Sequence, residues 1–375
     1  MKFLLAYILL ISLLFVPAFS EESASPMLAA DGSHMLALAS NGDVWAWGSN
    51  HRGETDPSDE SIRITEPKKV FENAALISAG QQFSMAVTAD GALYMWGDNR
   101  EGQIPRLEGE KAVSPTFVFE NVVSIDACDA IAACVTKDGR LHFWGGGQEI
   151  TSCLENVVKC AAGMNYALAL TSGGQVYEIT SGSDEPMLMA ENASDIDASG
   201  ESRYALLNDG TLCAWGASYT DGRLGINAGM RYVDTPETVA KDETISSLHA
   251  GLSFSGYIAD GNALHLWGTM YSYIYGLNDE GTLEAALFNG TLLTYGNTPL
   301  RLYENVKDAC MGDAFIALLF ENGDVYTWGS NDHGQLGNGA YTLTVMTESE
   351  EDDEYELEIL QSQDSVFPNI PITLK

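Results

Sequence analysis

The sequence predicts an all-β protein, a seven-bladed β-propeller of four-stranded blades. Two observations support this prediction. Seven similar units of about 50 residues fill the chain from residue 27 onward, and an Asp-Gly or Asn-Gly pair precedes almost every copy of a Trp-Gly dipeptide. The six copies of Trp-Gly lie at Trp47, Trp96, Trp144, Trp215, Trp267 and Trp328.

The first half of each unit predicts two strands joined by a tight turn. Examples are SMAVTADGALYMWG in the second unit and IALLFENGDVYTWG in the seventh, where apolar and polar residues alternate around the turn pair. The fourth unit has Ile179 and Thr180 in place of Trp-Gly, and the sixth carries one extra residue that indicates a bulge or longer turn. Because the tryptophan recurs once per blade, we expect a structural role for it, buried in blade packing.

The second half of each unit predicts the other two strands. After a loop of variable length, the chain resumes with a proline and an apolar strand, and often continues with Glu-Asn-Val, as in SPTFVFENVVSIDAC. Differences in unit length therefore fall in the loop that follows Trp-Gly. The first unit lacks the proline strand, and the chain finishes with FPNIPITLK. We expect the N- and C-terminal segments to close the ring, with residues 367–374 docked beside residues 27–30 and no open sheet edge.

The first 20 residues predict a signal peptide. Lys2 precedes an apolar run from Phe3 to Val16. The small residues Ala18 and Ser20 are then spaced for cleavage after Ser20. This run of 14 residues is shorter than the roughly 20 that span a membrane, so an uncleaved anchor is the lesser alternative. We expect residues 1–20 to be removed, residues 21–26 to be a short linker, and residues 27–375 to form a single propeller. The protein is then secreted or extracytoplasmic, with no membrane insertion.

The composition disfavours nucleic acid as a partner. Aspartate and glutamate number 53 against 18 lysines and arginines, for a formal charge of −35, and binding to phosphate backbones normally depends on clustered basic residues. Such a charge keeps a chain soluble and monomeric, and it also suits a basic partner or divalent cations. The six cysteines stand at core-type positions of the repeat and are expected as small buried side chains. A local bridge between Cys153 and Cys160 is the alternative.

No catalytic constellation is evident. The six histidines are spread over several units, and no nucleophile motif or carboxylate pair stands out from the repeat. We therefore expect no catalytic residues, no metal site and no cofactor.

Unit six departs from the repeat by an insertion, residues 269–297. Within it, Tyr271, Tyr273 and Tyr275 stand at alternate positions, which would place them on one face of a strand. One interpretation is an extra hairpin packed on the side of the blade. The other is an exposed aromatic patch that binds a protein or a glycan.

Unit seven departs from the repeat by an acidic run, residues 348–358. Eight of its eleven residues are carboxylates and none is basic. Such runs are usually solvated. A weaker interpretation is a calcium site with Asp352, Asp353 and Glu354 as ligands, although the run lacks the glycine and spacing of a known calcium loop.

These units resemble the regulator of chromosome condensation repeat family. The family motif combines an apolar strand, Asp-Gly, an aliphatic residue, Tyr and Trp-Gly with a following Asn and Gly-Gln-Leu-Gly, and ENGDVYTWGSNDHGQLGNG at residues 321–339 is its best copy here. The second and first units keep WGDNREGQI and WGSNHRGE. The resemblance covers nearly all of the chain after residue 26 and implies a seven-bladed propeller.

The family resemblance leaves three functions to weigh. The founding member is a nuclear exchange factor for a small GTPase that also binds chromatin, and other members of similar fold are extracellular binding proteins, including an inhibitor of β-lactamases. We expect a secreted or cell-surface, non-catalytic binding protein whose propeller loops form an interaction platform for a protein or glycan. The alternatives are an extracellular enzyme inhibitor, or an enzyme acting through the central face, and a GTPase exchange factor, which the signal peptide disfavours.

Overall fold

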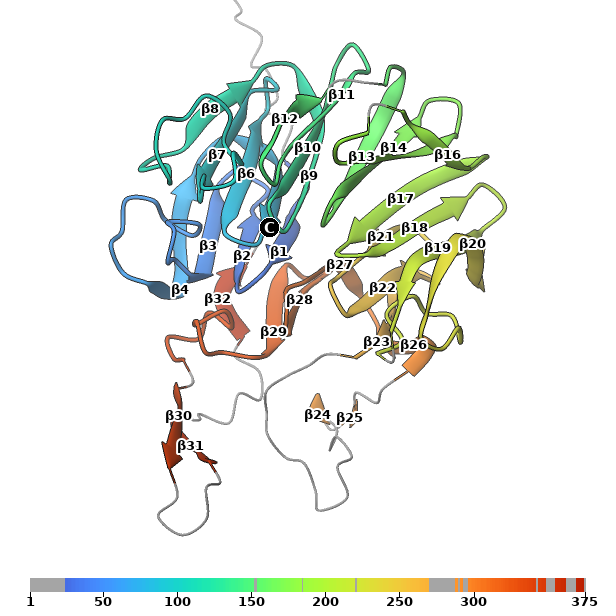
Figure 1. The fold of residues 1–375 in the computed structure, drawn as a ribbon. Helices are drawn as coiled ribbons and strands as arrows, with labels where there is room; N and C mark the ends of the chain where they lie inside the picture. Colours follow the sequence, from blue (N-terminus) through green and yellow to red (C-terminus); the bar gives the residue numbers. More distant parts are fainter. Residues whose placement is uncertain are drawn as a thin grey trace, which may run out of the picture.

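The computed structural model describes residues 24–151, 154–183, 185–219, 221–269, 287–288, 291–292, 296–341, 343–348, 355–361 and 369–373. All regular elements in these residues are β-strands, and they form seven four-stranded antiparallel sheets arranged in a ring (Figure 1). None of the described residues forms a helix with the length and apolarity to cross a bilayer. The all-β, seven-bladed fold is confirmed.

The first four blades occupy the first half of the chain. Blade one comprises β1 (Met27–Asp31), β2 (His34–Leu38), β3 (Val44–Ser49) and β4 (Arg63–Phe71). Blade two comprises β5 (Ala74–Gly80), β6 (Phe83–Thr88), β7 (Leu93–Gly97) and β8 (Thr116–Phe119). Blade three comprises β9 (Val122–Cys128), β10 (Ile131–Thr136), β11 (Leu141–Gly145) and β12 (Gln148–Thr151). Blade four comprises β13 (Val157–Gly163), β14 (Tyr166–Thr171), β15 (Val176–Thr180) and β16 (Met187–Ala190).

The other three blades follow the same plan. Blade five comprises β17 (Ala193–Ser199), β18 (Ser202–Leu207), β19 (Thr211–Ser218) and β20 (Arg231–Lys241). Blade six comprises β21 (Ser247–His249), β22 (Phe254–Ala259), β23 (Ala263–Gly268) and β26 (Gly296–Tyr303). Blade seven comprises β27 (Val306–Met311), β28 (Phe315–Phe320), β29 (Asp324–Gly329) and β32 (Asn369–Thr373). Two small hairpins stand apart from the blades, β24 (Leu287–Phe288) with β25 (Thr291–Leu292), and β30 (Leu343–Glu348) with β31 (Tyr355–Gln361).

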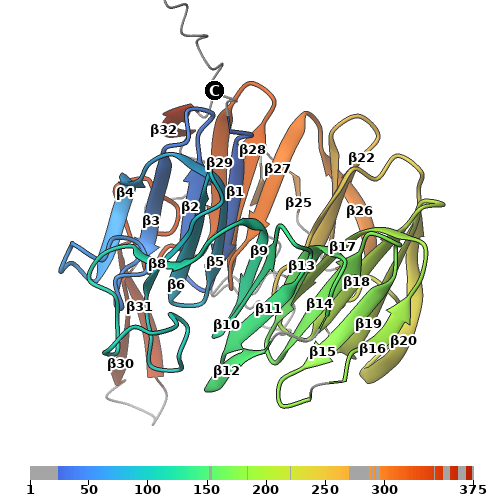
Figure 2. The ribbon, with the colours of Figure 1, turned by 90° about the horizontal axis from the view of Figure 1, so that it is seen from above.

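The ring closes by packing of the first blade against the last. The expected docking of residues 367–374 beside residues 27–30 is wrong. The C-terminal strand β32 pairs with β29 and is the outer strand of blade seven, so residues 369–373 do not pair with residues 27–30. Each blade is instead a continuous run of the chain, because β1 begins blade one as its inner strand. β1 lies beside β27 (Figure 2), and the Leu28 amide donates a hydrogen bond to the Asp308 carboxylate at 2.7 Å.

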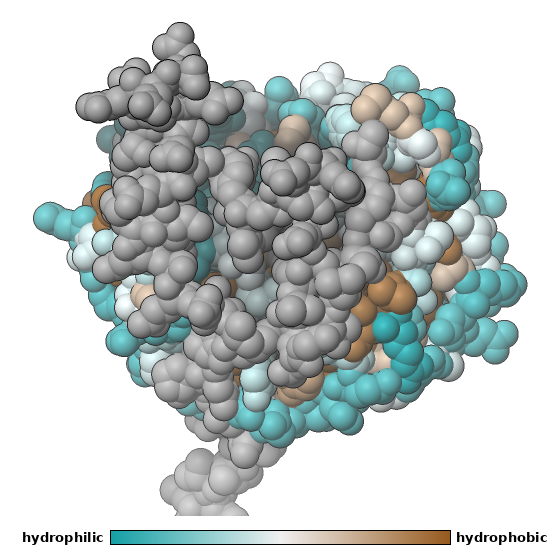
Figure 3. All heavy atoms as spheres, turned by 90° about the horizontal axis from the view of Figure 1, so that it is seen from below, coloured by the Kyte–Doolittle hydropathy of each residue, from teal (hydrophilic) through white to brown (hydrophobic). Residues whose placement is uncertain are grey.

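Two faces of the ring differ in their connections. The Asp-Gly and Asn-Gly turns between the second and third strands lie on one side, which we call the turn face. The loops after Trp-Gly and the hairpins that leave the inner strands lie at the opposite ends of the strands, on what we call the loop face. Figure 3 shows hydrophobic areas set among hydrophilic side chains on one side of the molecule. The largest differences in blade length lie at the loop face, although the turn-face link between β20 and β21, residues 242–246, is also longer than most.

The Glu-Asn-Val links explain how one blade leads to the next on the turn face. Their asparagines have φ values between 58° and 62°, the left-handed region that asparagine tolerates better than most residues. The residue after Asn121 donates its amide to the carbonyl of Gly91 in the preceding turn, and the Asn121 carbonyl accepts from the amide of Lys137 in the next. The same pair of backbone hydrogen bonds, one to the preceding turn and one from the next, recurs at Asn73, Asn156, Asn192 and Asn305.

The core lies between blades and runs around the whole ring. Buried side chains form contiguous clusters that join blades one to three, three to four, four to six, six to seven, and seven to one. All six tryptophans of the Trp-Gly series belong to this interior, with exposed fractions of 4% or less. Each tryptophan therefore packs between its own blade and a neighbour.

Candidate functional site

The loops after Trp-Gly in blades one, two, five and seven hold the tryptophan of the following blade. In four interfaces the indole N–H donates a hydrogen bond to a backbone carbonyl of the preceding blade's loop, at 2.7–3.0 Å. The pairs are Trp96 with Glu54, Trp144 with Gln103, Trp267 with Arg223, and Trp47 with Gln335. The last pair joins blade seven to blade one, so the same contact closes the ring.

These contacts explain the residue types of the Gly-Gln-Leu-Gly motif. The residue after the accepting carbonyl is an apolar side chain in three of the loops, and Leu336, Ile104 and Leu224 are at most 1% exposed. In two of these loops the next residue is a glycine with a positive φ, Gly225 or Gly337, and a Cβ on Gly337 would approach the Trp47 ring nitrogen to 2.8 Å. The motif therefore places one carbonyl and one apolar side chain against the next tryptophan.

Units three and four lack this loop. After Trp144 the chain turns through Gly145, Gly146 and Gly147 straight into β12, and blade four passes from β15 to β16 over residues 181–186. The missing loop of unit three explains the substitution in unit four. Ile179, which is fully buried, replaces the tryptophan where no loop carbonyl is present to accept an indole N–H.

Blade five retains the tryptophan, Trp215, although no loop of blade four supplies a carbonyl to accept its indole N–H. Its N–H donates instead to the Glu178 carboxylate of blade four at 3.1 Å, and Arg203 donates to the same carboxylate at 2.9 and 3.3 Å. The Arg203 guanidinium lies 3.6 Å from the centroid of the Tyr166 ring, a cation–π contact. Glu178 and Arg203 are both less than 10% exposed. A buried ion pair thus replaces the loop between blades four and five.

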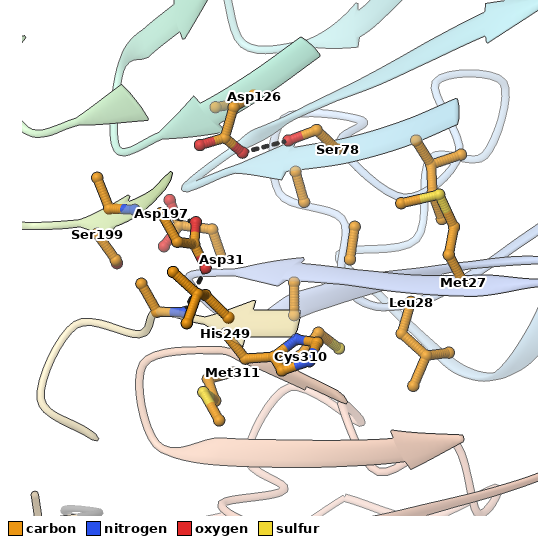
Figure 4. A pocket seen from close by; sticks show the side chains of 18 of the residues that line it. Met27, Leu28, Asp31, Ser78, Asp126, Asp197, Ser199, His249, Cys310 and Met311 are labelled. Atoms are coloured by element: carbon orange, nitrogen blue, oxygen red, sulfur yellow. Dashed lines mark hydrogen bonds between the residues drawn. The ribbon is translucent and has the colours of Figure 1, made fainter. Parts of the chain in front are cut away.

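The inner strands enclose a cavity of about 240 Å³ on the propeller axis. Its polar lining includes Asp126 on β9, Asp197 on β17, Asp308 on β27, His249 on β21 and Lys159 on β13. Figure 4 shows the Asp126 and Asp197 side chains directed toward this space from different blades. Residues far apart in sequence therefore meet at the axis.

The axial carboxylates are hydrogen-bonded to backbone amides of the next blade. Asp126 accepts from the Ala162 amide and Asp197 from the Ala250 amide, each at 2.7 Å, as Asp308 does from Leu28. Asp197 and Asp308 also accept from amides of their own strands. An inner strand has no further strand on its axial side, so these aspartates satisfy part of its free edge. Their first role is therefore to join blades.

Burial changes the ionisation of the axial groups. Loss of water contact raises the pKa of Asp126 and of Asp308 to about 7, that of Asp197 to about 6 and that of Asp31 to about 8. The negative charge of Asp197 acts in the same direction and raises the pKa of Asp126 further. Burial also lowers the pKa of His249 to about 4. Lys159 pairs with Asp195 at 2.5 Å, and although burial opposes it, this carboxylate raises the pKa of the lysine.

These pKa shifts predict that stability falls as the pH rises through neutrality. The carboxylates have a higher pKa folded than unfolded, so between about pH 4 and 8 the folded state binds more protons and the stabilisation is lost with rising pH. His34 and His249, with a folded pKa of about 4, oppose this trend only below about pH 6.5, where an unfolded histidine takes up a proton. Thermal melting should therefore show a lower Tm at pH 8.5 than at pH 6.5.

Asp126→Asn should reduce this dependence, because the amide cannot lose a proton. The matched control is Asp90→Asn on the exposed turn face, where a hydrogen bond from Thr88 lowers the pKa and the slope above pH 6.5 should stay unchanged. An equal slope in wild type and Asp126→Asn would contradict the assignment.

The structure places the candidates from the sequence in different ways. Tyr271, Tyr273 and Tyr275 lie outside the described residues, as do Asp352, Asp353 and Glu354. The two ends of the acidic run belong to β30 and β31, in which Glu348 pairs with Tyr355. Neither the aromatic patch nor the calcium site is therefore tested, and both stay predictions.

Sequence reasoning missed one convergence of histidines. His51 and His333, from the loops of blades one and seven, approach to 5.6 Å between ring centroids, and His333 lies 3.2 Å from the Asp332 carboxylate. Within the described part of the chain, no group of three or more His, Cys, Asp or Glu side chains could hold a metal ion. The five described cysteines are buried with free thiols, and Cys153 lies outside the described residues.

Comparison with known proteins agrees with the repeat pattern. The model of the regulator of chromosome condensation (RCC1) repeat matches residues 31–54, 75–103 and 306–335. The chain is 27% identical to the mouse E3 ubiquitin-protein ligase HERC2 over 327 residues, which is 81% of the chain but 6% of the ligase. It is 25% identical to the mitochondrial RCC1 domain-containing protein RUG3 of Arabidopsis thaliana over 288 residues, 70% of the chain and 57% of RUG3. The chain thus spans only part of each relative.

Solved structures share the architecture. Prp20p from Saccharomyces cerevisiae matches with a TM-score of 0.68 at 17% identity, over 88% of both chains, and human WBSCR16 with a TM-score of 0.63 at 17% identity, over 85% of this chain and 95% of its own. At these identities the likeness shows the fold alone. We conclude that the chain is a seven-bladed β-propeller in which residues 31–54, 75–103 and 306–335 match the regulator of chromosome condensation repeat.

Proposed function

We propose that the chain is a secreted or cell-surface, non-catalytic binding protein whose loop face receives a protein partner. The observation that supports this proposal is that the blades differ most in the length of the loops after Trp-Gly. Strand pairing and the turn-face links recur from blade to blade, while the loops after Trp-Gly range from the three glycines at 145–147 to the long segment between β29 and β32. Loops on a rigid scaffold are the usual place for recognition.

The relatives and the composition support the same reading. Stretches similar to this chain occur within a ubiquitin ligase and within a protein named as a GTPase regulator, and the description of the Prp20p structure names its binding to Gsp1p and histones. A formal charge of −35 favours a basic protein partner over nucleic acid. Residues 1–20 have the pattern of a signal peptide, which supports a location outside the cytoplasm. The glycan alternative depends on the tyrosines of the insertion.

The axial cavity favours one second candidate, an enzyme acting through the central face. Asp126 and Asp197 are buried, close enough to influence each other's ionisation, and accompanied by His249, a combination that suits acid–base chemistry. Against it, both carboxylates already accept amide hydrogen bonds from the next blade. Asp197→Asn separates the two roles. A binding protein should still capture its partner, whereas loss of a hydrolytic activity from a folded variant would support the enzyme.

Affinity capture from the native extracellular medium tests the proposed function. Tagged full-length chain should retain a specific partner at equilibrium, and a variant lacking residues 270–286 should report whether the insertion contributes. A reporter fused to residues 1–20 should be exported, which separates a secreted binding protein from an intracellular exchange factor. Retention of the reporter in the cytoplasm, or acceleration of nucleotide release from a small GTPase, would favour exchange instead.

A further inference from the structure

Two histidines meet across the seam between blade seven and blade one, where the ring closes. His51 lies in the loop that follows β3, and His333 lies in the loop that follows β29, at the other end of the chain. Their ring centroids are 5.6 Å apart, and the ring planes are inclined by 72°. His51 is exposed and His333 is partly buried. The pair therefore lies at the surface of the loop face, within reach of ions in solution.

The spacing of the two rings fits a single metal ion. Zinc binds an imidazole nitrogen at about 2.0–2.1 Å, which places each ring centroid about 3.2 Å from the ion. At tetrahedral or trigonal angles, two such rings have centroids about 5.2–5.5 Å apart, close to the separation of 5.6 Å between His51 and His333. The χ2 torsion of histidine is broad. Rotation of the exposed His51 ring therefore suffices to aim a nitrogen of each ring at one ion.

Asp332 orients the His333 ring for this task. Its Oδ2 lies 3.2 Å from Nδ1 of His333, and its Oδ1 accepts hydrogen bonds from the Ser330 hydroxyl at 2.7 Å and the Gln335 amide at 2.9 Å. The Gln335 side chain in turn accepts from the backbone amide of His333 at 2.8 Å. Metal-binding histidines usually place the second ring nitrogen against a carboxylate, which fixes the tautomer. Here Nε2 lies on the side of the ring away from Asp332.

The charges around the pair favour a cation. The carboxylates of Asp332 and Asp313 lie near His333, and the Arg52 guanidinium is 4.0 Å from the Asp98 carboxylate. Among the residues that the structure describes, no set of three or more His, Cys, Asp or Glu side chains could hold a metal. The chain therefore supplies two imidazoles and water supplies the other ligands. Imidazole suits zinc, nickel and copper, whereas calcium prefers oxygen ligands.

The seam is the one junction between neighbouring blades that the chain does not cross. β32 pairs with β29, so blades seven and one share no strand, and they lie side by side without a turn-face link (Figure 2). Hydrogen bonds across the seam join Leu28 to Asp308 and Trp47 to Gln335. A metal ion held by one histidine from each blade adds a further bond where the ring is closed by packing.

We propose that His51 and His333 form a binding site for one divalent ion of the zinc, nickel and copper class, which joins blade one to blade seven and stabilises the closed ring. The site goes beyond the binding function proposed above and does not depend on it. Asp332 is a positioning residue that acts through His333.

Titration of the metal-free full-length chain with zinc chloride, followed by calorimetry and thermal melting, tests the site. His51→Ala and His333→Ala should each weaken zinc binding by about tenfold or more, because the second imidazole binds intramolecularly in the wild type. Asp332→Ala should weaken it by about tenfold. Zinc should raise the wild-type Tm, since the ion binds the folded state, and raise it less in these variants. The matched control is His142→Ala on β11 of blade three, which should bind zinc as wild type does.

Calcium separates the histidine site from the acidic surface. Because calcium prefers carboxylates, its binding should be the same in wild type and in the double variant His51→Ala/His333→Ala. Equal zinc binding in those two proteins would overturn the proposal, as would zinc binding that leaves the wild-type Tm unchanged. Loss of binding in only one single variant would also overturn it, since one histidine does not join two blades. The His51 side chain is exposed, so His51→Ala should keep the metal-free Tm and remains a test if His333→Ala does not fold.

Discussion

Trp96→Ala is expected to lower the free energy of unfolding by about 3–5 kcal/mol, the usual cost of removing a large buried aromatic side chain. Trp96 is fully buried between blades one and two, and its N–H donates to the Glu54 carbonyl. The Ser84 hydroxyl donates to the same carbonyl at 2.7 Å. The substitution therefore opens a cavity and removes one of the hydrogen bonds that hold the loop of blade one. Equilibrium denaturation in urea or guanidinium measures the effect.

Two further variants separate the ring from the hydrogen bond. Trp96→Phe keeps most of the apolar contact and loses the N–H, so a smaller loss is expected. The Glu54 carbonyl keeps its hydrogen bond from Ser84, so the lost hydrogen bond itself should cost only about 0.5–1.5 kcal/mol. Trp45→Ala is the matched control, because Trp45 lies on the equivalent strand β3 of blade one but is only partly buried. Equal losses for Trp45→Ala and Trp96→Ala would contradict the role assigned to the Trp-Gly series.

Glu178→Ala is expected to cost about 3–5 kcal/mol, because it leaves the buried Arg203 guanidinium without its counter-charge. The same substitution removes the acceptor for the Trp215 indole N–H. Glu178→Gln keeps an acceptor and loses the charge, so it should be less destabilising. Glu155→Ala is the control. Its pair with Arg140 is exposed on both sides, and such pairs contribute about 1 kcal/mol or less.

A double replacement distinguishes an ion pair from a packing role. Glu178→Leu with Arg203→Met removes both charges at similar volume and should recover much of the loss, since buried pairs cost desolvation that apolar side chains avoid. Chemical denaturation should show the double variant more stable than Glu178→Ala. A double variant as unstable as the single one would show that the charges themselves hold blades four and five together.

The sequence was sufficient for the architecture because repetition carries the signal seven times. The turn pairs, the alternating strands and Trp-Gly recur in nearly every unit, so the loss of Trp-Gly at Ile179 did not hide the fourth blade. The strand that closes the ring was misjudged because FPNIPITLK resembles an outer strand of any blade. Only the pairing of β32 with β29 shows to which blade it belongs.

Contacts between units were not predictable from local pattern. Gly-Gln-Leu-Gly was visible as a motif, but the tryptophan it holds belongs to the next unit, and Trp47 meets the last unit of the chain. The axial carboxylates were missed for a similar reason. Asp126 and Asp197 hold equivalent places in SIDAC and DIDAS, but the second unit has Ser78 there, so a sequence pattern alone does not show a cluster. Their elevated pKa values follow from burial that only the closed ring creates.

The most direct measurement is site-specific photocrosslinking of the full-length chain in its native extracellular medium. A photoreactive phenylalanine derivative replaces Tyr232, at the loop-face end of β20, in one sample and Asp90, in a turn-face Asp-Gly pair, in another; both positions are exposed. We predict a specific protein adduct at position 232 and none at position 90. The same adducts at both positions, or an adduct at position 90 alone, would contradict recognition through the loop face.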